Sequence, residues 1–282
     1  MYKRLLSFGH GYSAQALACK LLPSGWKITG TTRDKEKIPK LRETGIVPFL
    51  WGNEDIEELF SNINAVLIST GPNEQGDPVF LQYHNLFKKY AAQIDWVGYL
   101  STTGVYGDFG GRWIDEMVTL NPQTRRGQLR LHAEKSWQSI PNLPLHIFRL
   151  AGIYGPGRGP FAKLRNGTAK RIIKKGQVFS RIHVDDIVQV LAASLFAPKP
   201  GRIYNVCDDN PAPPQDVIVY AAELLGLPHP PIVKFETAEL SPMVKSFYAD
   251  NKKVSNGRLK SELGVTLFYP DYKTGLRAIL GR

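Results

Sequence analysis

The sequence has little cysteine and no long apolar run, and each absence excludes a class of protein. Only Cys19 and Cys207 occur in 282 residues, so neither a disulfide scaffold nor a cysteine-rich metal protein is indicated. No apolar run approaches the roughly 18 residues that a membrane-spanning helix needs. The basic and then apolar N-terminus is interrupted by Gly9-His10-Gly11 and has no small-residue cleavage pattern, so we expect no signal peptide. These features, with 43% hydrophobic residues, predict a globular, cytoplasmic protein without a membrane partner.

Acidic residues are scarce in one window of a chain whose net charge is +11. Between Met117 and Val184, thirteen lysines and arginines stand against a single acid, Glu134, which gives this window a charge of +12 and leaves −1 for the rest. Such a concentration predicts that an anionic small molecule binds here, whereas uniform basicity would indicate little beyond solubility. Nucleic acid is a weaker alternative, because the most basic stretch, residues 163–175, lacks the interleaved aromatic side chains of a stacking platform.

Short apolar runs alternate with helical patterns along the first half of the chain. The predicted strands are residues 3–8, 26–31, 45–50, 65–69 and 96–101, and the predicted helices are residues 13–22, 35–43, 55–60 and 79–93. Residues 65–69 show no alternation, as expected of a strand that is buried on both faces of a parallel sheet. Strands separated by helices of this length predict βαβ units, and therefore an α/β protein with a doubly wound parallel (Rossmann) sheet.

The second half of the chain is less regular and richer in proline and glycine. Its predicted elements are helices at residues 126–138 and 184–196 and strands at residues 145–152 and 203–206. We expect a dinucleotide-binding domain, formed by residues 1–155 and 180–209, and a small C-terminal substrate lobe, formed by residues 156–179 and 210–282. The lobe would cap the carboxyl edge of the sheet, where open α/β sheets bind ligands.

A glycine-rich turn follows the first predicted strand. Gly9-His10-Gly11-Tyr12-Ser13-Ala14 fits G-x-G-x-x-(G/A), in which the first glycine permits a tight turn and the second lets the backbone approach a pyrophosphate. Tyr12 and Ser13 would open the following helix, whose N-terminal N–H groups attract phosphate. The motif predicts that Gly9, Gly11, Tyr12 and Ser13 bind a dinucleotide; the alternative is a purely structural turn between strand and helix.

The end of the second predicted strand indicates which dinucleotide is bound. An acidic residue here would hold a ribose 2′-hydroxyl and select NAD. This chain has Thr31-Thr32-Arg33-Asp34, in which Arg33 can make a bidentate contact with a 2′-phosphate and Thr32 can donate to it. We therefore expect NADP, with NAD as the alternative if Arg33 is a solvated charge and Asp34 binds the ribose.

Small hydroxyl residues end two further strands. Ser69, Thr70 and Gly71 follow the fourth predicted strand, and Ser101 and Thr102 end the fifth. Because they lie at the carboxyl edge of a parallel sheet, we expect them to contact a nicotinamide ribose and a substrate carbonyl. Each could alternatively be a helix cap or a turn residue.

Several motifs occur in the order typical of one family. Besides the glycine-rich turn, they are residues 101–107 (STTGVYG), 149–157 (RLAGIYGPG), 182–186 (IHVDD) and 204–206 (YNV). Together they resemble the extended short-chain dehydrogenases/reductases, the NAD-dependent epimerase/dehydratase family, and the resemblance covers nearly the whole chain. It implies a Rossmann fold, an NAD(P) cofactor and an oxidoreductase, epimerase or dehydratase activity. We expect residues 183–186 to position the lobe and cap a helix rather than bind a metal.

The family's catalytic pair, Tyr-x-x-x-Lys at the start of a helix, is missing from its expected place. Glu134 matches a glutamate four residues after the family's lysine, which puts Arg130 at the lysine position and Arg126 at the tyrosine position. The distance from Thr102, which matches the catalytic Ser/Thr, supports this register. Arginine stays protonated at any working pH, so Arg126 cannot be a general acid or base, whereas Arg130 could still hold a ribose or a phosphate.

Two literal Tyr-x-x-x-Lys strings occur elsewhere, at Tyr248 to Lys252 and at Tyr269 to Lys273. Both lie far beyond the sheet strands, and Pro270 would break the helix that the second string needs. We interpret both strings as coincidences.

Two hypotheses from different classes stay open. The first is an atypical oxidoreductase or nucleotide-sugar epimerase/dehydratase-like enzyme, in which Thr102 orients the substrate oxygen and Arg126 and Arg130 supply positive charge. Its proton would come from Tyr106, beside Thr102 in the Val-Tyr-Gly segment, or from water. The second is a catalytically inactive NADP-binding sensor or scaffold, because both members of the proton-transfer pair are replaced. The oligomeric state is open between a monomer and a homodimer.

Overall fold

The computed structural model describes residues 3–52 and 56–281, which divide into two compact units. Unit 1 comprises Met1–Thr102, Gln128–Arg149 and Ile187–Tyr204, and unit 2 comprises Thr103–Gly127, Leu150–Asp186 and Asn205–Arg282. The units differ from the predicted domains. Residues 103–127, for example, belong to unit 2 because Trp113 and Ile114 pair with Lys253 and Val254.

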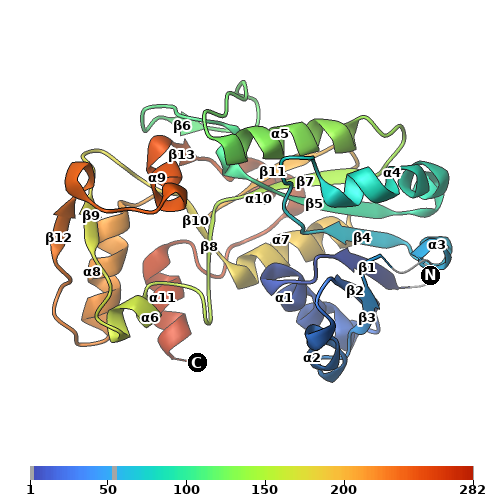
Figure 1. Ribbon diagram of the computed structural model, residues 1–282, viewed down its shortest axis with the longest axis horizontal. Helices are drawn as coiled ribbons and strands as arrows, with labels where there is room; N and C mark the ends of the chain where they lie inside the picture. Colours follow the sequence, from blue (N-terminus) through green and yellow to red (C-terminus); the bar gives the residue numbers. More distant parts are fainter. Residues whose placement is uncertain (1–2, 53–55, 282) are drawn as a thin grey trace. The chain divides into compact units, whose positions relative to one another are not determined.

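A seven-stranded sheet, most of it in unit 1, is the largest element of the fold (Figure 1). Its strands are β1 (Arg4–Phe8), β2 (Lys27–Thr32), β3 (Val47–Leu50), β4 (Ala65–Ile68), β5 (Trp96–Thr102), β7 (Leu145–Leu150) and β11 (Ile203–Val206). They lie in the order β11-β7-β5-β4-β1-β2-β3, and the four pairs from β5 to β3 are parallel. The predicted Rossmann sheet is therefore confirmed. The direction of winding reverses between β1 and β4, the kind of switch point beside which open α/β sheets bind ligands.

Helices cover both faces of the sheet. They are α1 (Tyr12–Leu21), α2 (Ile38–Glu43), α3 (Ile56–Ser61), α4 (Pro78–Tyr90), α5 (Arg125–Gln138) and α7 (Val184–Phe196), with 3₁₀ turns at Leu22–Ser24, Lys35–Lys37 and Ala91–Gln93. Alternate residues of β5 point to opposite faces: Val97 and Tyr99 join the core under α4 and α5, whereas the Trp96 indole donates to Ser194 of α7 (3.0 Å). Figure 1 shows α4 and α5 on one side of these strands and α1 and α7 on the other.

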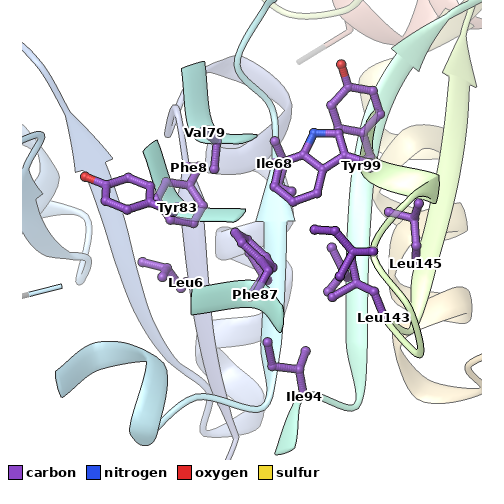
Figure 2. Close-up of a cluster of buried hydrophobic side chains, with 14 of the residues drawn as sticks. Leu6, Phe8, Ile68, Val79, Tyr83, Phe87, Ile94, Tyr99, Leu143 and Leu145 are labelled. Carbon is purple, nitrogen blue, oxygen red and sulfur yellow. The ribbon is translucent and has the colours of Figure 1, made fainter. Parts of the chain in front are cut away.

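An aromatic cluster fixes α3, α4 and α5 against β1, β4 and β5. Phe87 of α4 lies 5.0 Å from Phe60 and 4.7 Å from Trp137 between ring centroids, both edge to face, and Tyr83 stacks on Phe8 at 5.6 Å. Figure 2 shows Phe87 in the middle of the cluster, with Leu6, Ile94 and Leu143 around it. Such pairs each add about 0.5–1.5 kcal/mol beyond the burial of their area. The cluster thus packs these helices on one face of the sheet.

Unit 2 is built from three small parallel sheets of two strands each. They are β8 (Gly152–Tyr154) with β10 (Arg181–His183), β9 (Arg171–Ile173) with β12 (Ile232–Lys234), and β6 (Trp113–Ile114) with β13 (Lys253–Val254). Its helices are α6 (Phe161–Arg165), α8 (Pro214–Leu224), α9 (Pro242–Ala249), α10 (Gly257–Leu263) and α11 (Tyr272–Leu280), with 3₁₀ turns at Thr103–Val105 and Phe235–Thr237. Leu164, Ala221 and Leu276 bring α6, α8 and α11 into one apolar core.

The predicted elements of the first half are confirmed to within a few residues; residue 55, the first of one predicted helix, lies outside the described residues. One predicted strand, residues 145–152, is divided into β7 and β8 because the backbone changes partners at Ala151. The Ala151 N–H donates to the Val206 carbonyl (3.0 Å) and the next N–H, of Gly152, donates to the Ser180 carbonyl (3.1 Å). No helix within the described ranges is both long and apolar enough to cross a bilayer.

Candidate functional site

The glycine-rich turn joins β1 to α1 and is fastened to β2. Gly9 has a left-handed backbone (φ +70°), and a Cβ there would lie 2.7 Å from Cγ2 of Thr70, so glycine is required. The Gly9 N–H donates to Oγ1 of Thr31 (2.9 Å), and the His10 N–H donates to the Thr31 carbonyl (3.2 Å). The His10 ring covers Gly30, where a Cβ would lie 2.9 Å from Cγ of His10. The turn is therefore held firmly beside the carboxyl end of β2.

Gly11 caps α1 without a side chain that could occupy the helix N–H groups. A Cβ at Gly11 would meet only the Gly9 carbonyl, at an ordinary 3.7 Å, so packing within the protein does not require glycine here. The glycine instead leaves the backbone accessible to an outside group. With Tyr12 and Ser13 opening the helix, this arrangement fits a pyrophosphate, whose oxygens accept from N–H groups at a helix N-terminus.

Ser69 and Thr70, which follow β4, have different roles. The Ser69 hydroxyl lies 3.0 Å from the Phe8 carbonyl and 2.5 Å from the Gly9 carbonyl, so it supports the turn from within. Oγ1 of Thr70 is buried and has no hydrogen-bond partner among the described residues. A buried hydroxyl without a partner costs free energy, which a polar group of a ligand can recover. Ser69, Thr70 and Gly71 are the residues after β4 that are predicted to contact the cofactor. Of these three, Thr70 has a side-chain oxygen that makes no hydrogen bond among the described residues.

Arg130 joins the carboxyl ends of β4 and β5. Its Nη1 donates to the carbonyls of Thr70 (3.1 Å) and Leu100 (3.0 Å) and to the Tyr99 hydroxyl (3.0 Å). The guanidinium also lies over the Tyr99 ring, 5.5 Å from its centroid. Burial raises the pKa of Tyr99, so its phenol stays protonated and accepts from Arg130. A Cβ at Gly71 would lie 3.6 Å from Nη2 of Arg130, so this positive charge is fixed next to Gly71.

Ser101 is joined to α5 through a buried ion pair. Its hydroxyl donates to Oε1 of Glu134, and Oε2 of Glu134 lies 2.7 Å from Nη2 of Arg149. All three side chains are almost wholly buried. The predicted cofactor residue Ser101 therefore directs its hydroxyl at α5, which fastens this helix to β5. The helix in turn places Arg126 and Arg130 four residues apart on one face.

Thr32 ends β2, and Arg33 and Asp34 follow it. Oγ1 of Thr32 accepts from the Asp34 N–H (3.1 Å), and the Asp34 carboxylate accepts from the Glu36 N–H (3.0 Å) and lies 3.6 Å from Nζ of Lys37. Asp34 thus caps the turn that follows β2. Arg33 between them is exposed, so its guanidinium faces solvent at the strand end.

The two polar side chains predicted after β5 lie in different surroundings. Thr102, the last residue of β5, is half-buried. Tyr106 of unit 2 is fully buried, and its hydroxyl donates to Oδ1 of Asn205 (2.6 Å), whose amide donates to the Ser255 carbonyl (3.1 Å). Tyr106 is predicted to supply a proton to the substrate. In the structure, its hydroxyl instead donates this proton to a hydrogen bond in the interior of unit 2.

Arg126 lies in the first turn of α5 and is exposed. Its guanidinium lies over the ring of Phe247 of α9, 5.4 Å from the centroid. The neighbouring residue, Gly127, packs closely: a Cβ there would lie 2.6 Å from the Gly104 carbonyl. Phe247 carries no sequence signal of a site, because no motif includes it and only the fold brings it to Arg126.

The two literal Tyr-x-x-x-Lys strings are engaged in other contacts. Tyr248 and Lys252 are both buried, and Nζ of Lys252 donates to the Gly107 carbonyl (2.7 Å). The N–H of Tyr269 donates to the Asp186 carboxylate (3.1 Å). These contacts favour our interpretation of both strings as coincidences.

His183 begins the segment that is predicted to cap a helix. It is buried, and its Nδ1 accepts from the Asp185 N–H (3.2 Å) in the first turn of α7, as a cap does. Within the part of the chain that the structure describes, no group of three His, Cys, Asp or Glu side chains is arranged to hold a metal ion.

Comparison with known proteins gives relatives along the whole chain but no matching family model. Protein YeeZ of Escherichia coli (strain K12) is 30% identical over 282 residues, which cover 95% of this chain and 97% of that protein. A functionally unknown conserved protein from Silicibacter pomeroyi DSS has a structure that is 57% identical, with a TM-score of 0.96 and coverage of 99% of this chain and 98% of that one.

A more distant structure shows the same fold in a named family. It is the human epimerase family protein SDR39U1 (isoform 2) with NADPH, which is 17% identical, covers 99% of both chains and has a TM-score of 0.79. Because 99% of both chains is covered, the likeness extends beyond the glycine-rich turn. The chain therefore belongs to the family of protein YeeZ, and it has the Rossmann fold of the NAD-dependent epimerases and dehydratases, the extended short-chain dehydrogenases/reductases.

Proposed function

We propose that the protein is an NADP(H)-dependent oxidoreductase of the epimerase/dehydratase type that acts on an anionic substrate. The observation that carries the proposal is the set of groups at the carboxyl ends of β1 and β4. There the glycine turn is fastened to Thr31, α1 starts at Gly11 without a side-chain cap, and Arg130 holds a positive charge beside Gly71. The likeness to a structure that was determined with NADPH supports the same class of cofactor.

The cofactor's phosphates would be held by unit 1. Gly11, Tyr12 and Ser13 would bind the pyrophosphate at the start of α1. Arg33 and Thr32 would bind the 2′-phosphate, because a planar guanidinium matches phosphate oxygens and Asp34, the residue that would favour NAD, already caps a turn. These contacts support NADP over NAD. When bound, the nicotinamide ring supplies or accepts a hydride.

The chemistry would depend on arginines in place of the family's Tyr and Lys. Arg130 would hold the nicotinamide ribose together with Thr70 and Gly71, since its guanidinium is already fixed at that strand end. Arg126 would supply positive charge at the position of the family's tyrosine. Thr102 would orient the substrate oxygen. Neither arginine can release a proton, and the Tyr106 hydroxyl is bonded to Asn205, so water would supply it.

Titration calorimetry of the purified protein with NADP⁺, NADPH, NAD⁺ and NADH tests the cofactor assignment. We expect NADPH and NADP⁺ to bind at least about tenfold more tightly than NADH and NAD⁺, because a charge-assisted contact to the 2′-phosphate is gained. A preference for NAD⁺ would contradict the role of Arg33, and no binding of any of the four would contradict the proposal. Oxidation of NADPH in the presence of small carbonyl acids then distinguishes an oxidoreductase from a catalytically inactive NADP-binding sensor. Tight binding of NADPH without any turnover would support the sensor.

A further inference from the structure

Helix α9 of unit 2 presents two large apolar side chains to solvent. Met243 and Phe247 are four residues apart, on one face of the helix, and retain 64% and 48% of their exposure. The other side of the helix is anchored: Tyr248 is buried, and its ring contacts Phe179 and Phe235 at centroid distances of 5.2 and 5.0 Å. Neighbouring exposed apolar side chains often mark a place where a ligand or partner binds.

The C-terminal end of α9 is held by hydrogen bonds that do not involve its exposed face. Nζ of Lys174 donates to the Tyr248 carbonyl, and Nε2 of Gln177 donates to the Asp250 carbonyl (2.7 Å). Lys174 also lies over the Phe235 ring, 5.2 Å from the centroid. These contacts fix α9 in place, so Phe247 is exposed on a well-supported helix and not on a loose segment.

A positive charge lies on this apolar face. The Arg126 guanidinium lies over the Phe247 ring, 5.4 Å from its centroid, in a cation–π contact that keeps the charge beside the ring. A guanidinium carries its N–H donors in a planar fork that matches the oxygens of a carboxylate or phosphate. Arg126 and Phe247 thus combine a directional anion-binding group with an aromatic surface.

We propose that Arg126, Phe247 and Met243 form a substrate subsite for a small molecule that carries a carboxylate or phosphate next to an aromatic or other apolar group. The anion would bind to Arg126, and the apolar group would lie on Phe247 and Met243. Only the description of this ligand as a substrate rests on the proposed function, because binding at the subsite can be measured without cofactor.

Two anionic aromatic probes, benzoate and phenyl phosphate, and one neutral probe, benzyl alcohol, test the subsite by ligand-detected NMR titration of the full chain. We expect both anionic probes to bind and benzyl alcohol to bind at least about tenfold more weakly, since it lacks the charge-assisted hydrogen bonds. The anion that binds more tightly assigns the head group. Arg126→Gln should weaken the anionic probes about tenfold or more, and Phe247→Ala about threefold or more.

Matched variants show whether the losses of probe affinity are confined to substitutions in the subsite. Arg125→Gln removes the same charge from the neighbouring position of α5, and Phe268→Ala removes a phenyl ring that is 64% exposed elsewhere in unit 2. Both should leave probe affinity within twofold of the wild type. If Phe247→Ala fails to fold, Met243→Gln is the second variant, with an expected loss of about twofold or more.

The proposal is overturned if benzyl alcohol binds as tightly as the anionic probes, if no probe binds, or if Arg125→Gln weakens binding as much as Arg126→Gln does. NADPH titrations of the same proteins keep the two proposals apart. Probe binding that depends on Arg126 in a protein that binds no NADPH would support the subsite and contradict the cofactor assignment. Normal NADPH binding, together with probe binding that does not depend on Arg126, would support the cofactor assignment and contradict the subsite.

Discussion

Arg33 is the side chain on which the choice between NADP and NAD depends. It is exposed at the end of β2, next to Thr32 and Asp34, which hydrogen-bond to each other. Arg33→Ala should weaken NADPH binding at least about tenfold, because the charge-assisted hydrogen bonds to the 2′-phosphate are lost. NADH, which has a hydroxyl at this position, should bind within twofold of its wild-type affinity. Titration calorimetry measures both affinities.

Lys35 gives the matched control for Arg33, since it is an exposed cation two residues further along the same segment. Lys35→Ala should leave the ratio of the NADPH and NADH affinities unchanged. If both variants lower NADPH binding equally, the effect is general electrostatic attraction and Arg33 is not a specific ligand. If Arg33→Ala weakens NADH as much as NADPH, the 2′-phosphate is not its target.

At the scale of the element, α5 depends on one buried ion pair. Glu134 and Arg149 have side chains that are 1% and 3% exposed, and Ser101 also donates to Glu134. Glu134→Gln keeps the shape but leaves the Arg149 charge uncompensated, so the free energy of unfolding should fall by about 3–5 kcal/mol. Urea denaturation followed by tryptophan fluorescence measures the change.

The exposed pair of Glu57 and Lys89 is the control for the buried pair, because solvent screens it. Glu57→Gln should leave the urea midpoint unchanged. The double variant Glu134→Gln, Arg149→Met should recover part of the loss, since no charge is then buried alone. A Glu134→Gln midpoint equal to that of the wild type would show that the pair does not support α5.

The elements that the sequence predicts are those with a periodic or a continuous apolar pattern. The strands and helices from β1 to β5 follow from that pattern, and so does α7. The basic residues 163–175 do not form one element: α6 ends at Arg165, and residues 171–173 are a strand that pairs with β12. Its partner lies about sixty residues further along the chain, and local periodicity carries no information on such a distant pairing.

The candidate site was predictable where a motif specifies the backbone and less so where side chains choose among partners. Gly9 and Gly11 have the geometry that their motif demands. Ser101 has the small hydroxyl side chain expected of a cofactor ligand, but its hydroxyl bonds to a carboxylate 33 residues away. Tyr106 likewise bonds to Asn205, 99 residues away. Hydroxyl groups are satisfied by whichever acceptor the fold brings near, which one sequence does not specify.

At the scale of the whole molecule, the basic window is less available to ligands than its charge of +12 suggests. Arg149 is paired with Glu134 in the interior, and Arg130 is bonded to strand carbonyls. Arg181 donates to the carbonyls of Phe179 and Ala212. Arg149 and Arg181 therefore serve the fold, and Arg130 is fixed at the strand ends beside Gly71. The attraction of a further anion depends on exposed members of the window such as Arg126. A net charge therefore has to be divided into structural and exposed cations before it predicts a partner.

Two buried groups make the units respond to acid in opposite directions. In unit 1, burial lowers the pKa of His146 from 6.5 to about 4, and its Nε2 accepts from the Lys199 N–H (2.8 Å). In unit 2, burial raises the pKa of Asp186 from 3.8 to about 6, although its carboxylate accepts from the N–H groups of Phe268 and Tyr269. Folding thus makes His146 harder to protonate and Asp186 easier to protonate than in the unfolded chain.

The signs of these shifts predict how stability changes between pH 7.5 and pH 5. The unfolded chain binds a proton at His146 more readily, so this group lowers the free energy of unfolding as pH falls, by about 2 kcal/mol at pH 5. Asp186 takes up its proton more readily when folded, so it raises the free energy of unfolding by about 1 kcal/mol over the same range. His146→Gln should therefore reduce the loss of stability in acid, and Asp186→Asn should increase it, in urea denaturation at both pH values. His132→Gln replaces an exposed histidine on α5 and should leave the loss of stability in acid unchanged. Equal pH dependence in all four proteins would show that neither buried group controls the response, because a group that titrates differently in the folded and unfolded chain must change the slope.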